Sequence, residues 1–67
     1  MLSPEVIFEI RIQVTKVDDD TFVPSMTHNG NPVHMRSMNT AEAALLEALL
    51  PISNTTAHDL IAGRLNI

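Results

Sequence analysis

One stretch of this 67-residue chain, THNGNPVHMR at residues 27–36, gathers side chains that suit the binding of an anion. No acid occurs from Thr21 to Ala41, although the whole chain has a net charge of −4. Arg36 can hold a phosphate or a carboxylate through its forked N–H donors. The asparagines around Gly30 add paired donors and acceptors, and the backbone beside a glycine can approach a ligand closely.

The anion-binding hypothesis extends to the start of the helix that is predicted to follow. Free amides and the dipole at a helix N-terminus favour negative charge. We therefore take seven residues as candidate ligand contacts: His28, Asn29, Asn31, His34, Arg36, Asn39 and Thr40. A nucleotide is one small anionic ligand that these groups would suit. In a symmetric oligomer, one arginine per chain becomes two or four around an axis, which helps a small chain to build a pocket.

The same stretch is also typical of an ordinary hairpin turn. Asn and Gly accept positive φ at low cost, so the pair is favoured in turns for backbone reasons alone. The chain has no glycine-rich loop ending in Lys and Ser or Thr, and no G-x-G-x-x-G pattern. A binding site and a polar turn without a further role therefore both remain open.

Metal binding and catalysis have less support in the sequence. His28 and His34 are six residues apart and His58 is distant, which matches no zinc motif. The run Asp18–Asp20 lacks the alternating ligands of a calcium loop. The chain has no Cys, so it offers neither a thiol nucleophile nor a disulfide. We expect no metal, no cofactor and no enzymatic activity.

The first half of the chain predicts a three-stranded antiparallel meander. The run VIFEIRIQV alternates apolar and polar residues, which is the period of a half-buried strand. Three adjacent aspartates at 18–20 and the run Asn-Gly-Asn at 29–31 predict the two turns. Pro24 cannot donate to a ladder, so the second strand is an edge or carries a bulge there. The predicted strands are residues 6–14, 21–27 and 32–38.

The second half predicts a helix over AEAALLEALL, which consists of strong helix formers. Asn39 or Thr40 caps its start, and Glu42 lies three residues after Asn39, as in a capping box. Pro51 disfavours a helical conformation at the residue before it, so the helix is predicted to end at Leu50.

A second, short helix is predicted over residues 56–62, capped by Asn54 or Thr55 and followed by Gly63 at the C′ position. Leu65 and Ile67 then form a short strand or cover the core. The order β-β-β-α-α predicts one α+β domain over residues 1–67, with both short helices packed on one face of the sheet.

The first helix is apolar around most of its circumference, which indicates burial on two sides. Its central stripe is Ala41, Ala44, Leu45, Ala48 and Leu49, and Leu46 and Leu50 widen it. Either a second subunit covers Leu46 and Leu50, or the short helix covers them with Leu60 and Ile61. A small core with no Cys favours a homo-oligomer, a dimer or a tetramer.

The composition also restricts partners and location. Four Lys and Arg against eight Asp and Glu argue against nucleic-acid duplex binding. No apolar run reaches the roughly 18 residues of a membrane span, and the start lacks the basic region of a signal peptide. We expect a soluble, cytoplasmic protein without membrane contact.

Three functional hypotheses follow from these observations. The first is a non-enzymatic homo-oligomer that binds or sequesters a small anionic ligand near the subunit junction. The second is an adaptor or inhibitor, of the kind that viruses use, which docks on a protein through the edge of the second strand and the acidic turn. The third is a structural subunit of a larger assembly.

Overall fold

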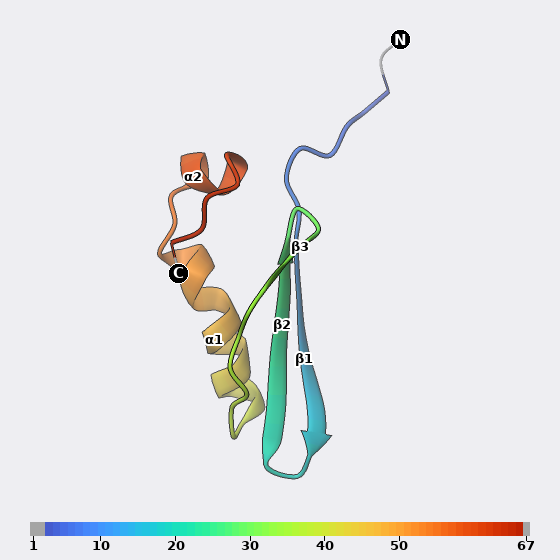
Figure 1. The fold of residues 1–67 in the computed structure, drawn as a ribbon, viewed down its shortest axis with the longest axis vertical. Coiled ribbons are helices and arrows are strands. Elements are labelled where there is room, and N and C mark those ends of the chain that lie inside the picture. The colour runs from blue at the N-terminus through green and yellow to red at the C-terminus, as the bar shows by residue number, and fades with distance from the viewer. Residues whose placement is uncertain (1–2, 67) are drawn as a thin grey trace.

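The computed structural model describes residues 3–66, which form a three-stranded antiparallel sheet followed by two helices (Figure 1). This arrangement confirms the predicted α+β class and element order. The strands are β1 (Ile10–Asp18), β2 (Thr21–His28) and β3 (Asn31–Val33), and the sheet order is β1-β2-β3. The helices are α1 (Ala41–Ser53) and α2 (Ala57–Ile61).

The β1–β2 hairpin is the longest paired unit, and it begins and ends later than the sequence pattern predicts. Ile10 pairs with His28, and the chain turns through Asp19 and Asp20 after Asp18 pairs with Thr21. Residues 6–9 carry the strand pattern but lie outside the strand, because β2 ends at His28 and offers them no regular ladder. Only two of the three aspartates form the turn, and the Asp18 carboxylate accepts a hydrogen bond from the Asp20 N–H at 2.9 Å.

The third strand is much shorter than predicted, and Pro24 explains where it stops. Phe22 exchanges two backbone hydrogen bonds of 2.8 Å with Met38, so its N–H points away from β1. Two residues later the Pro24 nitrogen points the same way and has no hydrogen to donate. β3 pairs only with Met26–His28. The residues that follow, 34–37, lie opposite Pro24 and form no strand. The prediction of an edge strand or a bulge at Pro24 is wrong, because β2 is the central strand and Val14 pairs with Pro24 in a regular part of the ladder, whose register shift lies between Lys16 and Asp18.

Helix α1 begins at the predicted place and ends one turn later than predicted. Thr40 is the N-cap, because its hydroxyl accepts a hydrogen bond from the Ala43 N–H at 3.1 Å. The capping box that Asn39 and Glu42 suggested is absent. Pro51 lies inside the helix, which continues to Ser53. In the last turn Pro51 removes only one helical hydrogen bond, and its ring is buried.

Helix α2 is a single short segment held by caps at both ends. Thr56 is its N-cap, rather than the predicted Asn54 or Thr55, and accepts from the Asp59 N–H at 3.2 Å. Gly63 takes the predicted C′ position with φ +85°. The N–H groups of Gly63 and Arg64 donate to the carbonyls of Leu60 and Asp59 at 3.2 and 2.8 Å. This pair of bonds is a Schellman motif, which only a left-handed residue at Gly63 allows.

The core lies between α1 and the hairpin and is small. α1 packs against β2 and β1, and the most buried apolar side chains of residues 3–66 are Met26, Ala44 and Ala48. The chain extends 51 × 25 × 16 Å, with a radius of gyration of 13.9 Å against about 11 Å for a compact chain of this length. Leu65 forms no strand, and Ile67 lies outside the described residues.

The corrected cap of α1 gives a stability prediction. Thr40→Ala leaves the Ala43 N–H without its partner and is expected to lower the free energy of unfolding by about 1 kcal/mol. Asn39→Ala serves as the control and should change it by less than about 0.5 kcal/mol. Urea unfolding at one protein concentration measures both. A larger loss for Asn39→Ala than for Thr40→Ala would contradict this assignment.

Candidate functional site

The seven predicted ligand contacts lie in three separate places. His28, Asn29 and Asn31 lie at the β2–β3 turn, His34 and Arg36 lie in the segment after β3, and the last two residues begin α1. The three groups differ in exposure and in their hydrogen-bond partners.

His28 is a buried structural residue in this fold. Its side chain is only 5% exposed, and its Nε2 lies 2.9 Å from the carbonyl oxygen of Leu60, so it links the end of β2 to α2. The ring of Phe8 meets the imidazole edge-on, with 5.5 Å between the ring centroids. A ring enclosed by these contacts has little freedom to bind a small ligand.

Asn29 also forms hydrogen bonds within the fold. It adopts φ +50°, and its side-chain oxygen accepts a hydrogen bond from the Glu9 N–H at 2.7 Å. Its own N–H donates to the Glu9 carbonyl at 2.8 Å. Asn29 thus closes the ladder where β2 ends. Asn31 lies in β3 and is exposed.

Arg36 forms an ion pair with Glu47 on α1. Its Nε and Nη2 atoms lie 3.3 and 3.4 Å from the two carboxylate oxygens. The hydrogen bonds to Glu47, and then the attraction between the charges, raise the pKa of Arg36 above its ordinary value. Glu47 lies seven residues after Thr40, about 10 Å along the helix. Arg36 therefore contacts the middle of α1, and the ion pair does not place it at the helix N-terminus.

A hollow of about 230 Å³ lies beside this ion pair. It is smaller than the roughly 300–1,000 Å³ typical of ligand pockets. His34 is its one candidate contact, and the Glu47 carboxylate also lines it, which repels an anion. Its other lining residues are Met35, Leu50, Pro51, Asn54 and Asn66.

The N-terminus of α1 is partly occupied by the protein itself. The Thr40 hydroxyl accepts a hydrogen bond from the Ala43 N–H. Asn39, one residue before Thr40, is exposed. Among the predicted contacts, the structure thus brings His28 to α2, Asn29 to Glu9 and Arg36 to Glu47. The seven residues do not line a single cavity, and ligand binding stays a prediction.

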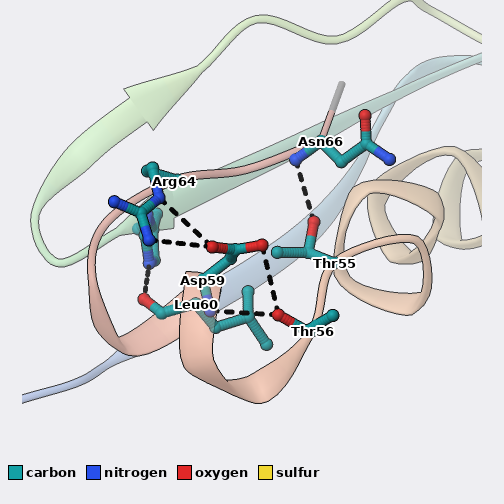
Figure 2. A network of polar contacts seen from close by, with 7 residues as sticks. Thr55, Thr56, Asp59, Leu60, Arg64 and Asn66 are labelled. Carbon is teal, nitrogen blue, oxygen red and sulfur yellow. Dashed lines mark hydrogen bonds and ion pairs between the residues drawn. The ribbon is translucent and has the colours of Figure 1, made fainter.

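The polar residues of the last segment form a network of their own (Figure 2). Arg64 donates twice to one oxygen of the Asp59 carboxylate, at 3.2 and 3.0 Å, and the Thr56 hydroxyl donates to the other at 3.2 Å. The Asn66 N–H donates to the Thr55 hydroxyl at 2.9 Å. The first three bonds hold α2 to the residues on either side of it. The Thr55 hydroxyl in turn donates to the Pro51 carbonyl at 2.5 Å, so the residues after α2 are linked to the end of α1 through Thr55.

The leucines of α1 form the most conspicuous surface of the described chain. We call Leu45, Leu46, Leu49 and Leu50 the leucine face. Their exposed fractions are 44, 62, 38 and 52%. The sequence left open whether a second subunit or the short helix covers Leu46 and Leu50, and it assigned Leu45 and Leu49 to the central apolar stripe.

That assignment was wrong because the buried stripe is centred on Ala44, Ala48 and Pro51, at i, i+4 and i+7. Small side chains let the helix axis approach the sheet closely, and the leucines on either side stay outside. The interpretation that α2 covers Leu46 and Leu50 is also wrong, because both remain more than half exposed. The spacing of the alanines was the signal that could have identified this arrangement.

Three further findings bear on the class of site. Among residues 3–66 no group of three or more His, Asp and Glu side chains could hold a metal ion. No helix in that range is long and apolar enough to cross a membrane. No protein-family model, curated protein or solved structure matches the chain.

His28 provides a test of its structural role. His28→Ala leaves the Leu60 carbonyl without its partner and is expected to lower the free energy of unfolding by roughly 1–3 kcal/mol. His34→Ala is the matched control, because His34 is exposed, and should change it by less than about 0.5 kcal/mol. Equal effects of the two changes in thermal or urea unfolding would show that the His28 contact does not stabilise the fold.

Proposed function

We propose that this protein is a non-enzymatic, self-associating accessory protein whose leucine face packs against the leucine face of a second copy. The single observation that carries the proposal is the exposure of four leucines on one helix of a chain with a small core. Soluble monomers rarely leave an apolar surface of this kind uncovered.

The accessible surface supports a second copy as the occupant. The chain exposes 5154 Å², whereas a compact monomer of 7.4 kDa exposes about 4,200 Å². The excess of about 950 Å² is of the same order as the roughly 800 Å² that each partner contributes to a stable interface. An assembly of two or more copies would also supply the core that a 67-residue chain lacks.

The arrangement of the leucines fits a contact between two identical helices. Leu46 and Leu50 are one turn apart, as are Leu45 and Leu49, so the face consists of two i, i+4 ridges. Such ridges can lie in the grooves of a second α1 related by a two-fold axis. The pairing is self-complementary, because each copy presents the same ridges.

A small anionic ligand at the subunit junction remains a proposal with less geometric support. Arg36 is 76% exposed and could exchange Glu47 for a ligand, and His34 lines the neighbouring hollow. Native mass spectrometry with nucleotides tests this idea. Arg36→Ala should remove any adduct that depends on the arginine, and an adduct that persists unchanged would exclude Arg36 as a contact.

Docking on another protein through the acidic turn also remains a proposal. Asp19 and Asp20 are exposed, and the nearest cation, Lys16, lies 4.0 Å from the Asp19 carboxylate. The edge of the second strand, which the sequence suggested for this docking, is not free, because β2 is the central strand. The free edge of the sheet next to the acidic turn is β1.

Substitutions on the leucine face test the proposed self-association. Leu46→Glu and Leu50→Glu each place a carboxylate in the contact and are expected to raise the dissociation constant of the assembly about tenfold or more. Both positions are exposed in the single chain, so circular dichroism should show an unchanged fold. Sedimentation equilibrium measures the association.

Val17→Glu is the matched control, because Val17 is 57% exposed and lies on β1 instead of α1. It should leave the association constant within about twofold of the parent. A parent chain that sediments as a monomer at high micromolar concentration would overturn the proposed function, and so would leucine variants that associate as tightly as the parent.

A further inference from the structure

Strand β1 is a free edge of the sheet, and the ladder shows which of its backbone groups point outward. Phe22 bonds to Met38 on the far side of β2, so Phe22 and its β1 partner Lys16 form a non-hydrogen-bonded pair. The Glu9 carbonyl, in contrast, accepts from Asn29 at 2.8 Å. The backbone N–H and C=O groups of odd-numbered β1 residues therefore point toward β2. Those of even-numbered residues point outward and are unpaired at the free edge. The outward groups belong to Ile10, Ile12, Val14 and Lys16.

Residues 6–8 before β1 continue the strand pattern but pair with no strand within residues 3–66. The apolar alternation begins at Val6, yet the ladder begins at Ile10. Val6 and Ile7 are 75 and 68% exposed, and Figure 1 shows this segment running beyond the end of the hairpin. An exposed apolar run that continues an open edge strand is a feature that favours strand pairing between chains.

We propose that residues 6–14 of two copies pair as antiparallel strands about a two-fold axis at Ile10. This inference rests on the proposed self-association and adds a second contact on a different element. In this register Val6 faces Val14 of the second copy, and Phe8 faces Ile12 of the second copy. All are even-numbered, so the pairing uses the outward backbone groups and joins the apolar faces of two sheets into one.

Charge selects this register over its neighbours. Pairing about Ile10 places Glu9 opposite Arg11 of the second copy, and Arg11 opposite Glu9 of the second copy. Glu9 and Arg11 already form an ion pair within one chain, with side chains 46 and 78% exposed. The four charges would alternate in sign across the two-fold axis, and opposite charges in facing positions stabilise a strand pair.

The neighbouring registers are less favourable. A shift of two residues in one direction places Glu9 opposite Glu9 of the second copy, and a shift in the other places Arg11 opposite Arg11 of the second copy. Like charges in facing positions destabilise a strand pair. A shift of one residue would place even-numbered residues, whose backbone groups point outward, opposite odd-numbered residues, whose groups point inward. It would also put the apolar side chains of the two copies on opposite faces of the joined sheet.

Charge reversal at these two positions tests the pairing. Glu9→Arg places two arginines opposite two arginines in the homo-oligomer, and Arg11→Glu places two glutamates opposite two glutamates. Each variant alone is expected to self-associate about tenfold or more weakly than the parent. An equimolar mixture should restore association, because every facing pair then has opposite charge. Sedimentation equilibrium measures affinity, and native mass spectrometry identifies the mixed species by mass.

Net charge alone predicts a different result. Glu9→Arg changes the charge of the chain from −4 to −2 and would strengthen association through reduced repulsion, whereas Arg11→Glu changes it from −4 to −6 and would weaken it. Glu5→Arg is the matched control, because it also gives −2 but faces Thr15 of the second copy. It should not weaken association. Weakening by both reversals and rescue in the mixture supports the edge pairing.

The two proposals fail separately. If Leu46→Glu weakens association and the charge reversals do not, the edge pairing is wrong and the leucine contact stands. If the charge reversals weaken association, the mixture restores it and Leu46→Glu has no effect, the edge pairing stands and the leucine contact is wrong. A monomeric parent, or a mixture that stays as weak as its components, overturns the edge pairing.

Discussion

The fold depends on the close approach of α1 to the β1–β2 hairpin. Ala44 and Ala48 have no side chain beyond Cβ, so the helix can lie near the buried Met26 of β2. Dispersion contacts and burial at this boundary are the main apolar stabilisation of the single chain. The rest of the molecule, including α2 and the segment after β3, is attached to this unit by hydrogen bonds and ion pairs.

The same approach determines which surface remains available for association. When alanines occupy the inner side of α1, the larger leucines must lie at its flanks and outer side. The chain therefore buries its small apolar residues and exposes several large ones, which is the reverse of the usual distribution. A second copy would restore the usual distribution without any change in the fold of the chain.

Several polar residues of the predicted binding site hold elements of the fold together. His28 bonds to Leu60 of α2, Asn29 bonds to Glu9, and Arg36 bonds to Glu47. In a chain with few apolar contacts, these bonds position segments that a larger core would hold by packing. A stretch without acids can thus arise because its side chains form hydrogen bonds and ion pairs with acids and backbone groups elsewhere in the same chain.

The sequence by itself determined the order of elements, the Asn29–Gly30 turn and the left-handed Gly63, because hydrophobic period and backbone preference act within a few residues. Only the tertiary structure decided where β1 begins, where β3 stops and that α1 continues through Pro51. It also decided that His28 is buried and that Leu45 and Leu49 are exposed. These features depend on partners distant in sequence: a strand becomes regular only beside another strand, and a helix face is chosen by the surface that it meets.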